Sequence, residues 1–142
     1  KFFYDFYSDF DVRRANEMIK SLDIDVNEKL KTMSKGTKEK VQLILVMSRN
    51  ASIYILDEPT TGLHFEDIRV LLGVLNKLVD RGNTIIVIEH NQDIIKSADY
   101  IIDMGPDGGI GGGTVVAYGK PEDIVRKGNS FTSEYLRKEI SK

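Results

Sequence analysis

Apolar residues in the first fifty positions recur at three- and four-residue steps. From 11 to 22 the apolar stripe consists of Val12, Ala15, Met18, Ile19 and Leu22. This spacing predicts a short amphipathic helix at the periphery of the fold. After a polar, lysine-rich connection, residues 41–47 are apolar nearly all round. They predict a second helix that is mostly buried and starts near Ser34.

The pattern changes after residue 52, where short apolar runs flank a long helical stripe. Residues 53–56 are uniformly apolar, and residues 84–88 are apolar on both faces, as in buried strands. The helical face between them consists of Ile68, Leu71, Leu72, Leu75, Leu78 and Val79, and Arg81-Gly82-Asn83 ends that helix. The order strand, helix, strand predicts a parallel pair joined by a right-handed crossover.

The last fifty residues continue the alternation. We expect a short helix at 92–97, strands at 100–104 and 114–118, and then two short helices. The glycine-rich segment 105–113 predicts a turned loop that needs positive φ, rather than a phosphate contact. Together these elements predict an α/β fold in which helices flank a parallel sheet core.

Composition narrows the functional classes. The 142 residues are 41% hydrophobic and 30% charged, and the net charge of -2 predicts no global attraction to nucleic acid or anionic lipid. Without cysteine there is no disulfide or thiolate chemistry, and we expect no zinc site. No apolar run approaches the roughly 20 residues that span a bilayer, so we expect a cytoplasmic protein. A lysine-rich patch, interpreted as a solvated helix face, comprises Lys29, Lys31, Lys35, Lys38 and Lys40.

Acidic residues follow two of the predicted strands. Asp57 and Glu58 come at the end of the run IYILDEP, and Glu89 and His90 come directly after residue 88. Side chains at the carboxyl ends of neighbouring parallel strands meet at one edge of a sheet. There Asp57 would hold a magnesium ion carrying nucleotide phosphates, Glu58 would deprotonate a water, and His90 would contact the terminal phosphate. Singly, these residues also fit a turn cap, a solvated acid and a surface histidine.

Four segments, in order, resemble those of ABC-type ATPases. Met33-Ser34-Lys35-Gly36-Thr37 is similar to their signature sequence, LDEP to Walker B, TTGLH to the D-loop and VIEHN to the switch-histidine segment. The resemblance implies a P-loop NTPase fold, ATP as the substrate, Mg²⁺ as the cofactor and a second ABC half-site as a partner.

The same resemblance implies roles for individual residues. Ser34, Lys35 and Gly36 would bind the γ-phosphate held by the other half-site, because a serine hydroxyl and the amides that open a helix form an anion site. Lys35 stands where glycine is usual. The D-loop residues are Gly62, Leu63 and His64. His64 replaces the usual aspartate, and it either contacts the partner half-site or occupies a turn.

The two parts of the chain resemble different ABC ATPases. Residues 52–142 look like the C-terminal end of the UvrA family, the damage-recognition ATPases of bacterial nucleotide excision repair. Residues 3 to about 51 look like the helical signature subdomain of a bacterial ABC exporter ATPase, in which SKGTKEK is a familiar variant, and we assign residues 1–51 to this subdomain. We therefore divide the chain at Ala51-Ser52 and expect a chimera, with a divergent natural protein as the alternative.

The sequence contains no G-x-x-x-x-G-K-[ST], the Walker A loop that cradles nucleotide phosphates. We expect a partial ABC ATPase fold that hydrolyses ATP only when an upstream segment or another chain supplies this loop. The resemblance to the UvrA family implies coupling of ATP hydrolysis to DNA-damage recognition, with DNA and excision-repair proteins as partners. The alternative is a fragment of an ABC transporter subunit that acts as an interaction module on a membrane permease.

Overall fold

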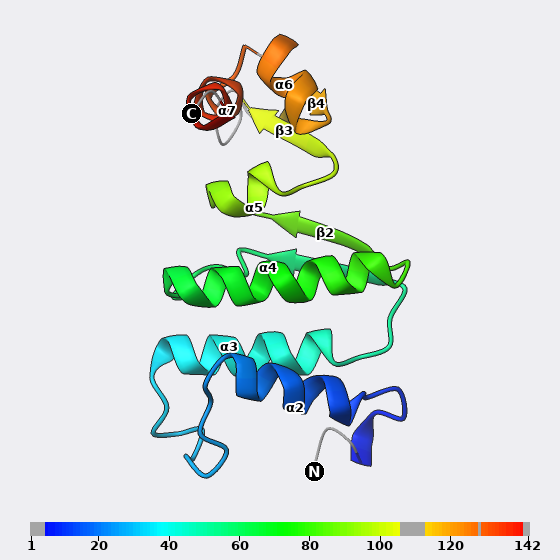
Figure 1. The fold of residues 1–142 in the computed structure, drawn as a ribbon, viewed down its shortest axis with the longest axis vertical. Coiled ribbons are helices and arrows are strands. Elements are labelled where there is room, and N and C mark those ends of the chain that lie inside the picture. The colour runs from blue at the N-terminus through cyan, green and yellow to red at the C-terminus, as the bar shows by residue number, and fades with distance from the viewer. Residues whose placement is uncertain (1–4, 106–112, 128, 141–142) are drawn as a thin grey trace. The chain divides into compact units, whose positions relative to one another are not determined.

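The computed structural model describes residues 5–105, 113–127 and 129–140, and the chain divides into two compact units, Lys1–Glu89 and His90–Lys142. The elements of the first unit are α2 (Val12–Ser21), α3 (Lys35–Met47), β1 (Ile53–Asp57), α4 (Phe65–Asp80) and β2 (Thr84–Ile88) (Figure 1). Those of the second are α5 (Gln92–Lys96), β3 (Ile101–Gly105), β4 (Thr114–Gly119), α6 (Pro121–Lys127) and α7 (Phe131–Ile140).

Strands β1 and β2 form a parallel pair. Ile53 lies opposite Thr84, and Asp57 lies opposite Ile88, without a register shift. Helix α4 connects the two strands along the chain and packs against β2. The predicted strand–helix–strand unit is confirmed, and the last residues of both strands lie at the same end of the sheet.

One face of this two-stranded sheet is covered and the other is exposed. Tyr54 and Leu56 are buried, because alternate side chains of β1 point to the covered face. The exposed set, which we call the open face, consists of Ile53, Ile55, Ile86 and Ile88, each at least half exposed. The expectation of strands buried on both faces is therefore wrong, since the described residues cover only one of them.

Asp11 caps the N-terminus of α2. Its Oδ1 accepts a hydrogen bond from the Arg14 N–H at 3.0 Å, and this bond holds the pKa of the Asp11 carboxyl below its usual value. The predicted apolar stripe is confirmed at Ala15 and Met18, which are buried. The Arg14 side chain donates from Nη1 to the Met47 carbonyl at 3.0 Å, so it ties α2 to the end of α3.

Helix α3 begins directly after Ser34, as expected. Its burial differs from the prediction: Ile44 and Met47 are buried, but Val46 is 47% exposed. The expectation of a mostly buried helix is wrong, because α2 packs against α3 while Gln42 and Val46 stay exposed.

In the second unit, β3 and β4 pair antiparallel, with an irregularity between Asp103 and Met104. Ile124 of α6 and Leu136 of α7 are 2% and 1% exposed and form the centre of its core. Most of the glycine-rich loop expected at 105–113 lies outside the described residues. Within the described ranges, no helix has the length and apolar character needed to cross a membrane.

Candidate functional site

The acidic residues predicted at the end of the first strand lie at the common end of the sheet. Asp57 is the last residue of β1 and pairs with Ile88, the last residue of β2. The N–H of the next residue, Glu58, donates to the Ile88 carbonyl at 2.9 Å. Both carboxylates are exposed, so a ligand can reach them. The prediction that the ends of the two strands lie side by side is confirmed.

Glu58 has an unusual backbone conformation. Its φ is 44°, in the left-handed region that few residues other than glycine adopt. Thr61 supports it twice: the Thr61 N–H donates to the Glu58 carbonyl at 3.1 Å, and the Thr61 hydroxyl lies 3.4 Å from Oε2. Such conformations cost about 1–3 kcal/mol and are concentrated at functional sites. The conformation therefore marks Glu58 as a candidate catalytic residue on structural grounds.

Glu89 contacts the turn that follows Glu58. Its Oε1 accepts hydrogen bonds from the Thr60 N–H at 2.8 Å and from the Thr60 hydroxyl. Sequence reasoning placed Glu89 at a strand end without giving it a partner. In the sequence, Glu89 can be recognised as a carboxylate directly before His90. The turn geometry that brings Thr60 to Glu89 cannot be read from the sequence.

His90 is exposed and is the first residue of the second unit. It follows the end of β2 by two residues, as the sequence predicted. Its contact with the terminal phosphate, and its meeting with Asp57 and Glu58, stay predictions.

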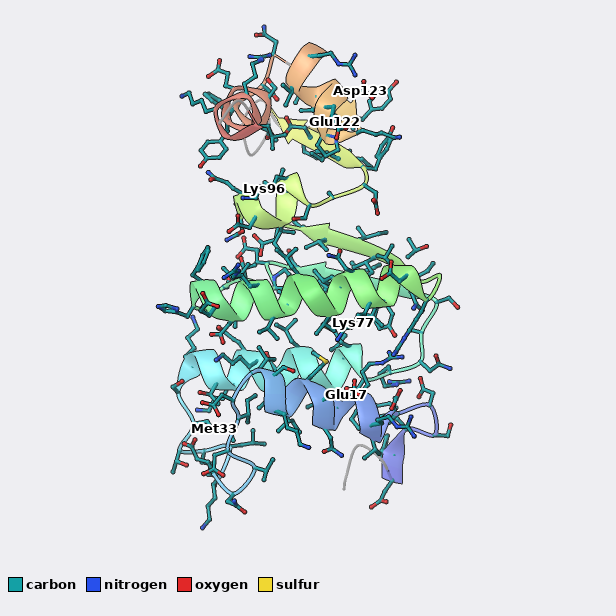
Figure 2. The ribbon with its side chains drawn as sticks, in the orientation of Figure 1. Glu17, Met33, Lys77, Lys96, Glu122 and Asp123 are labelled. Atoms are coloured by element: carbon teal, nitrogen blue, oxygen red, sulfur yellow. The ribbon has the colours of Figure 1, made fainter. Side chains whose placement is uncertain are left out.

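The predicted signature residues open α3. Met33, labelled in Figure 2, is buried just before them. Ser34 is the N-cap, and its Oγ accepts from the Thr37 N–H at 3.1 Å. Lys35 extends into solvent, with its side chain 84% exposed and Nζ 3.8 Å from Glu39 Oε1. The structure shows Ser34 capping the helix, and its binding of a γ-phosphate stays a prediction.

Gly36 and Gly62 bring the signature segment against the D-loop. A Cβ on Gly36 would lie 2.7 Å from the Gly62 carbonyl oxygen, too close for any side chain. Gly62 has a φ of 71°, and a Cβ there would collide with the Glu39 carboxylate. Glycine at both positions permits this approach. The segments that resemble the signature sequence and the D-loop are thus in direct contact within the first unit.

The remaining D-loop residues lead into α4. The Leu63 N–H donates to the Thr60 carbonyl at 3.0 Å, and Leu63 is half-buried. His64 is the N-cap of α4, and its N–H donates to Asp67 Oδ2 at 3.2 Å. His64 therefore occupies a helix-capping turn, and its contact with a second half-site stays a prediction.

An ion pair joins the signature helix to α4. Lys40 Nζ lies 2.7 Å from Asp67 Oδ1, and the two side chains are 19% and 17% exposed. The interpretation of the lysine-rich patch as a solvated face is wrong for Lys40, because this side chain faces a carboxylate on the neighbouring helix. Asp67 also accepts from the His64 N–H, so the pair connects α3 to the start of α4 just after the D-loop.

The carboxylates at the strand end fit a magnesium site. Mg²⁺ in nucleotide enzymes is usually held by one or two carboxylates together with water and substrate phosphates. Asp57 offers an exposed carboxylate in that position, and the exposed Glu58 lies next to it. Within the described ranges, no group of three or more histidine, cysteine or acidic side chains has metal-binding geometry.

Many nucleotide-binding folds contain a parallel strand–helix–strand unit, and the similarity to solved structures defines the class as P-loop ATPases of the ABC type. Members of the P-loop class generally use a nucleoside triphosphate with Mg²⁺. The chain belongs to the family described as "AAA domain, putative AbiEii toxin, Type IV TA system", which it matches over residues 5–95, more than half of its length.

The chain is also homologous to a segment of UvrABC system protein A. It is 56% identical over 110 residues to the Deinococcus radiodurans protein, covering 75% of this chain and 11% of that one. With the Aquifex aeolicus protein the identity is 44% over 146 residues, covering 98% and 16%. The chain thus spans between a tenth and a sixth of the length of these relatives. The second alignment runs through both parts of the chain.

Solved structures confirm the fold. UvrA2 from Deinococcus radiodurans matches with a TM-score of 0.73 and 32% identity, covering 88% of this chain and 16% of that chain. An ATP-binding subunit of an ABC transporter matches with a TM-score of 0.69 and 25% identity, covering 92% and 54%. The predicted α/β fold of a partial ABC ATPase is confirmed.

Proposed function

We propose that this chain is the catalytic and signature portion of an ABC-type ATPase that couples ATP hydrolysis to DNA-damage recognition in nucleotide excision repair. One observation carries the catalytic part: Asp57 and Glu58 lie where β1 and β2 end side by side, with Glu58 in a strained conformation. Identities of 44–56% to proteins named UvrABC system protein A support the repair context.

In this proposal Asp57 holds the Mg²⁺ that accompanies ATP, and Glu58 orients and deprotonates the attacking water. His90 donates a hydrogen bond to the γ-phosphate as charge develops on it. Magnesium would neutralise charge on the phosphates, while these side chains position the water and move its proton.

The second half of the proposed mechanism involves a partner. The opening of α3, at Ser34, Lys35 and Gly36, contacts the γ-phosphate bound by another ABC half-site. The D-loop, formed by Gly62, Leu63 and His64, faces that half-site. The protein acts in the cytoplasm, and its other proposed partners are DNA and the proteins of the excision-repair system.

A transplant into a relative tests the function. The 142 residues replace the matching segment of Aquifex aeolicus UvrABC system protein A, which aligns with 98% of this chain, and ATP hydrolysis is measured with and without damaged DNA. We expect hydrolysis that responds to damage, and a loss of at least about 100-fold in kcat for Glu58→Gln, with ATP binding retained. Glu134→Gln, an exposed acid on α7, is the control and should hydrolyse normally. Normal turnover in the Glu58→Gln transplant would contradict the proposed role.

The isolated chain gives a second test, because its sequence has no Walker A loop. We expect it to hydrolyse no measurable Mg-ATP. Appreciable turnover would mean that other residues bind the phosphates.

The alternative is an interaction module derived from an ABC transporter, with nucleotide chemistry lost. The match to the ATP-binding subunit of a transporter favours this alternative, although its identity is only 25%. The test combines a transporter partner that has a Walker A loop with either the original chain or Glu58→Gln. Equal rates of ATP hydrolysis in the two complexes would support the alternative.

A further inference from the structure

The turn between β1 and α4 is held at two points by consecutive residues from the end of β2. At the first residue after β1, the Glu58 N–H donates to the Ile88 carbonyl at 2.9 Å. Two residues later, the N–H and the hydroxyl of Thr60 both donate to Oε1 of Glu89. Ile88 ends β2 and Glu89 follows it, so one strand end fixes the turn that carries Glu58.

Glu58 depends on such support. Its φ of 44° is sparsely populated for a residue with a side chain, and it persists only where the surroundings hold it. The hydrogen bond to the Ile88 carbonyl restrains the amide on the N-terminal side of Glu58. The hydrogen bonds to Glu89 restrain the backbone on its C-terminal side, at Thr60. Without the second restraint, the turn can relax toward ordinary φ values, which would swing the Glu58 carboxylate away from its present direction.

The Glu89 contact is well suited to this task. Hydrogen bonds to an ionised carboxylate are roughly twice as strong as those between neutral groups, and the N–H to Oε1 distance of 2.8 Å lies in their usual range. Glu89 and Thr60 are both half-buried, which limits competition from water. A single oxygen receives both bonds, so it fixes the Thr60 backbone and the Thr60 side chain together.

We propose that Glu89 is a positioning residue for the catalytic carboxylate: through Thr60 it fixes the turn that directs Glu58 at the attacking water. This inference rests on the proposed function, in which Glu58 activates that water. In this inference Glu89 acts through Thr60 and not directly on nucleotide or metal. A misplacement of about 1 Å in a reacting group lowers rates by about 100-fold, so a turn of this kind affects kcat strongly.

Two pairs of variants separate positioning from a direct chemical role. Glu89→Ala removes the acceptor, whereas Glu89→Gln keeps an amide oxygen that accepts two hydrogen bonds. Thr60→Val removes the hydroxyl donor and keeps the N–H, whereas Thr60→Ser keeps both donors. If Glu89 only positions the turn, the conservative member of each pair restores function. If its charge acts directly on substrate or metal, Glu89→Gln fails like Glu89→Ala.

The kinetic experiment uses the transplanted protein described above. We expect Glu89→Ala to lower kcat by about 10- to 100-fold while the KM for ATP changes by less than about threefold, because the contact acts on the attacking step. Thr60→Val lowers kcat by less, and Glu89→Gln and Thr60→Ser stay within about threefold of the original rate. A Glu89→Gln variant as slow as Glu89→Ala overturns the inference.

Amide hydrogen exchange in the 142-residue chain provides a readout without ATP. The Thr60 N–H should exchange slowly in the original chain and in Glu89→Gln, and at least about tenfold faster in Glu89→Ala. Glu134→Ala is the matched control and leaves Thr60 exchange unchanged. Slow Thr60 exchange in Glu89→Ala overturns the inference, whatever the kinetics show.

The two proposals fail in different ways. A transplant that hydrolyses no ATP, or that is unaffected by Glu58→Gln, refutes the proposed function, and the catalytic part of this inference falls with it. An active transplant that loses activity in Glu58→Gln but not in Glu89→Ala refutes the positioning role alone.

Discussion

Gly62 and Gly73 are two glycines of the first unit with opposite surroundings. Gly62 has a φ of 71° and lies against the Glu39 carboxylate, where the D-loop contacts α3. Gly73 lies inside α4, is exposed, and has open space where a Cβ would be. The same substitution at the two sites therefore separates a glycine that the fold requires from one that it tolerates.

We expect Gly62→Ala to lower the free energy of unfolding by about 1–2 kcal/mol, because a Cβ is unfavourable in the left-handed region. Gly73→Ala should raise it by about 0.5–1 kcal/mol, because alanine is the better helix former. Urea unfolding of both variants measures the difference. A Gly62→Ala variant as stable as the original chain would mean that the D-loop does not need this conformation.

At the scale of elements, the start of α2 depends on one ionised side chain. The Arg14 N–H donates to the Asp11 carboxylate, and this bond keeps the pKa of Asp11 below 3.8 in the folded chain. A lowered folded-state pKa means that the ionised form stabilises the fold at pH values above 3.8. This contribution is lost as the pH falls through the folded-state pKa.

Asp11→Ala should reduce the free energy of unfolding by about 1 kcal/mol at pH 7, the usual effect of losing an N-cap. The difference from the original chain should shrink when the pH is brought below 3.8, because protonation weakens the cap in the original chain as well. Urea unfolding across this range measures it. Glu28→Ala removes an exposed acid outside α2 and serves as the control. A difference that does not change with pH would contradict the role of ionised Asp11.

The elements themselves were largely predictable from the sequence. The periodic stripes of α2 and α4 identify them because each helix buries one face, and the order strand, helix, strand led to the parallel pair of β1 and β2. The strand ends were predictable for the same reason, so Asp57 and Glu58 were found together. Burial could not be predicted in the same way. An apolar pattern shows which face of a helix or strand favours burial, but it does not show whether another segment covers that face.

Contacts across turns and between helices could not be predicted in this way. The Glu89–Thr60 bonds require the geometry of the turn after Glu58, which periodicity does not encode. The Lys40–Asp67 pair requires the relative placement of two helices. In both cases polar residues look like ordinary surface residues in the sequence, and only the fold reveals their partners.

At the scale of the molecule, the open face is the main apolar surface of the first unit's sheet. Its four isoleucines are between 50% and 67% exposed, and they lie on neighbouring positions of two paired strands. Contiguous apolar surface of this kind is uncommon on proteins that act alone. The chain spans only 11–16% of its relatives UvrABC system protein A from Deinococcus radiodurans and Aquifex aeolicus.

We expect the isolated chain to bind a hydrophobic dye such as ANS, and the double variant Ile55→Thr, Ile86→Thr to bind it less. The two residues are paired neighbours on the open face, and threonine keeps the β-branched shape that strands favour. Stability should change by less than about 0.5 kcal/mol per substitution, because both side chains are exposed. Val26→Thr, at an exposed site outside the sheet, is the control. Equal dye binding by the double variant and the original chain would show that the dye binds elsewhere.

The contact between Gly36 and Gly62 has a mechanical consequence. Ordinarily a side chain between two stretches of backbone can change rotamer and absorb a small displacement. At Gly36 the Gly62 carbonyl oxygen occupies the space that a Cβ would need, so the glycine has no side chain with which to absorb a displacement. Because the two backbones approach each other at this point, a displacement of the first turn of α3 would press on the loop ahead of α4.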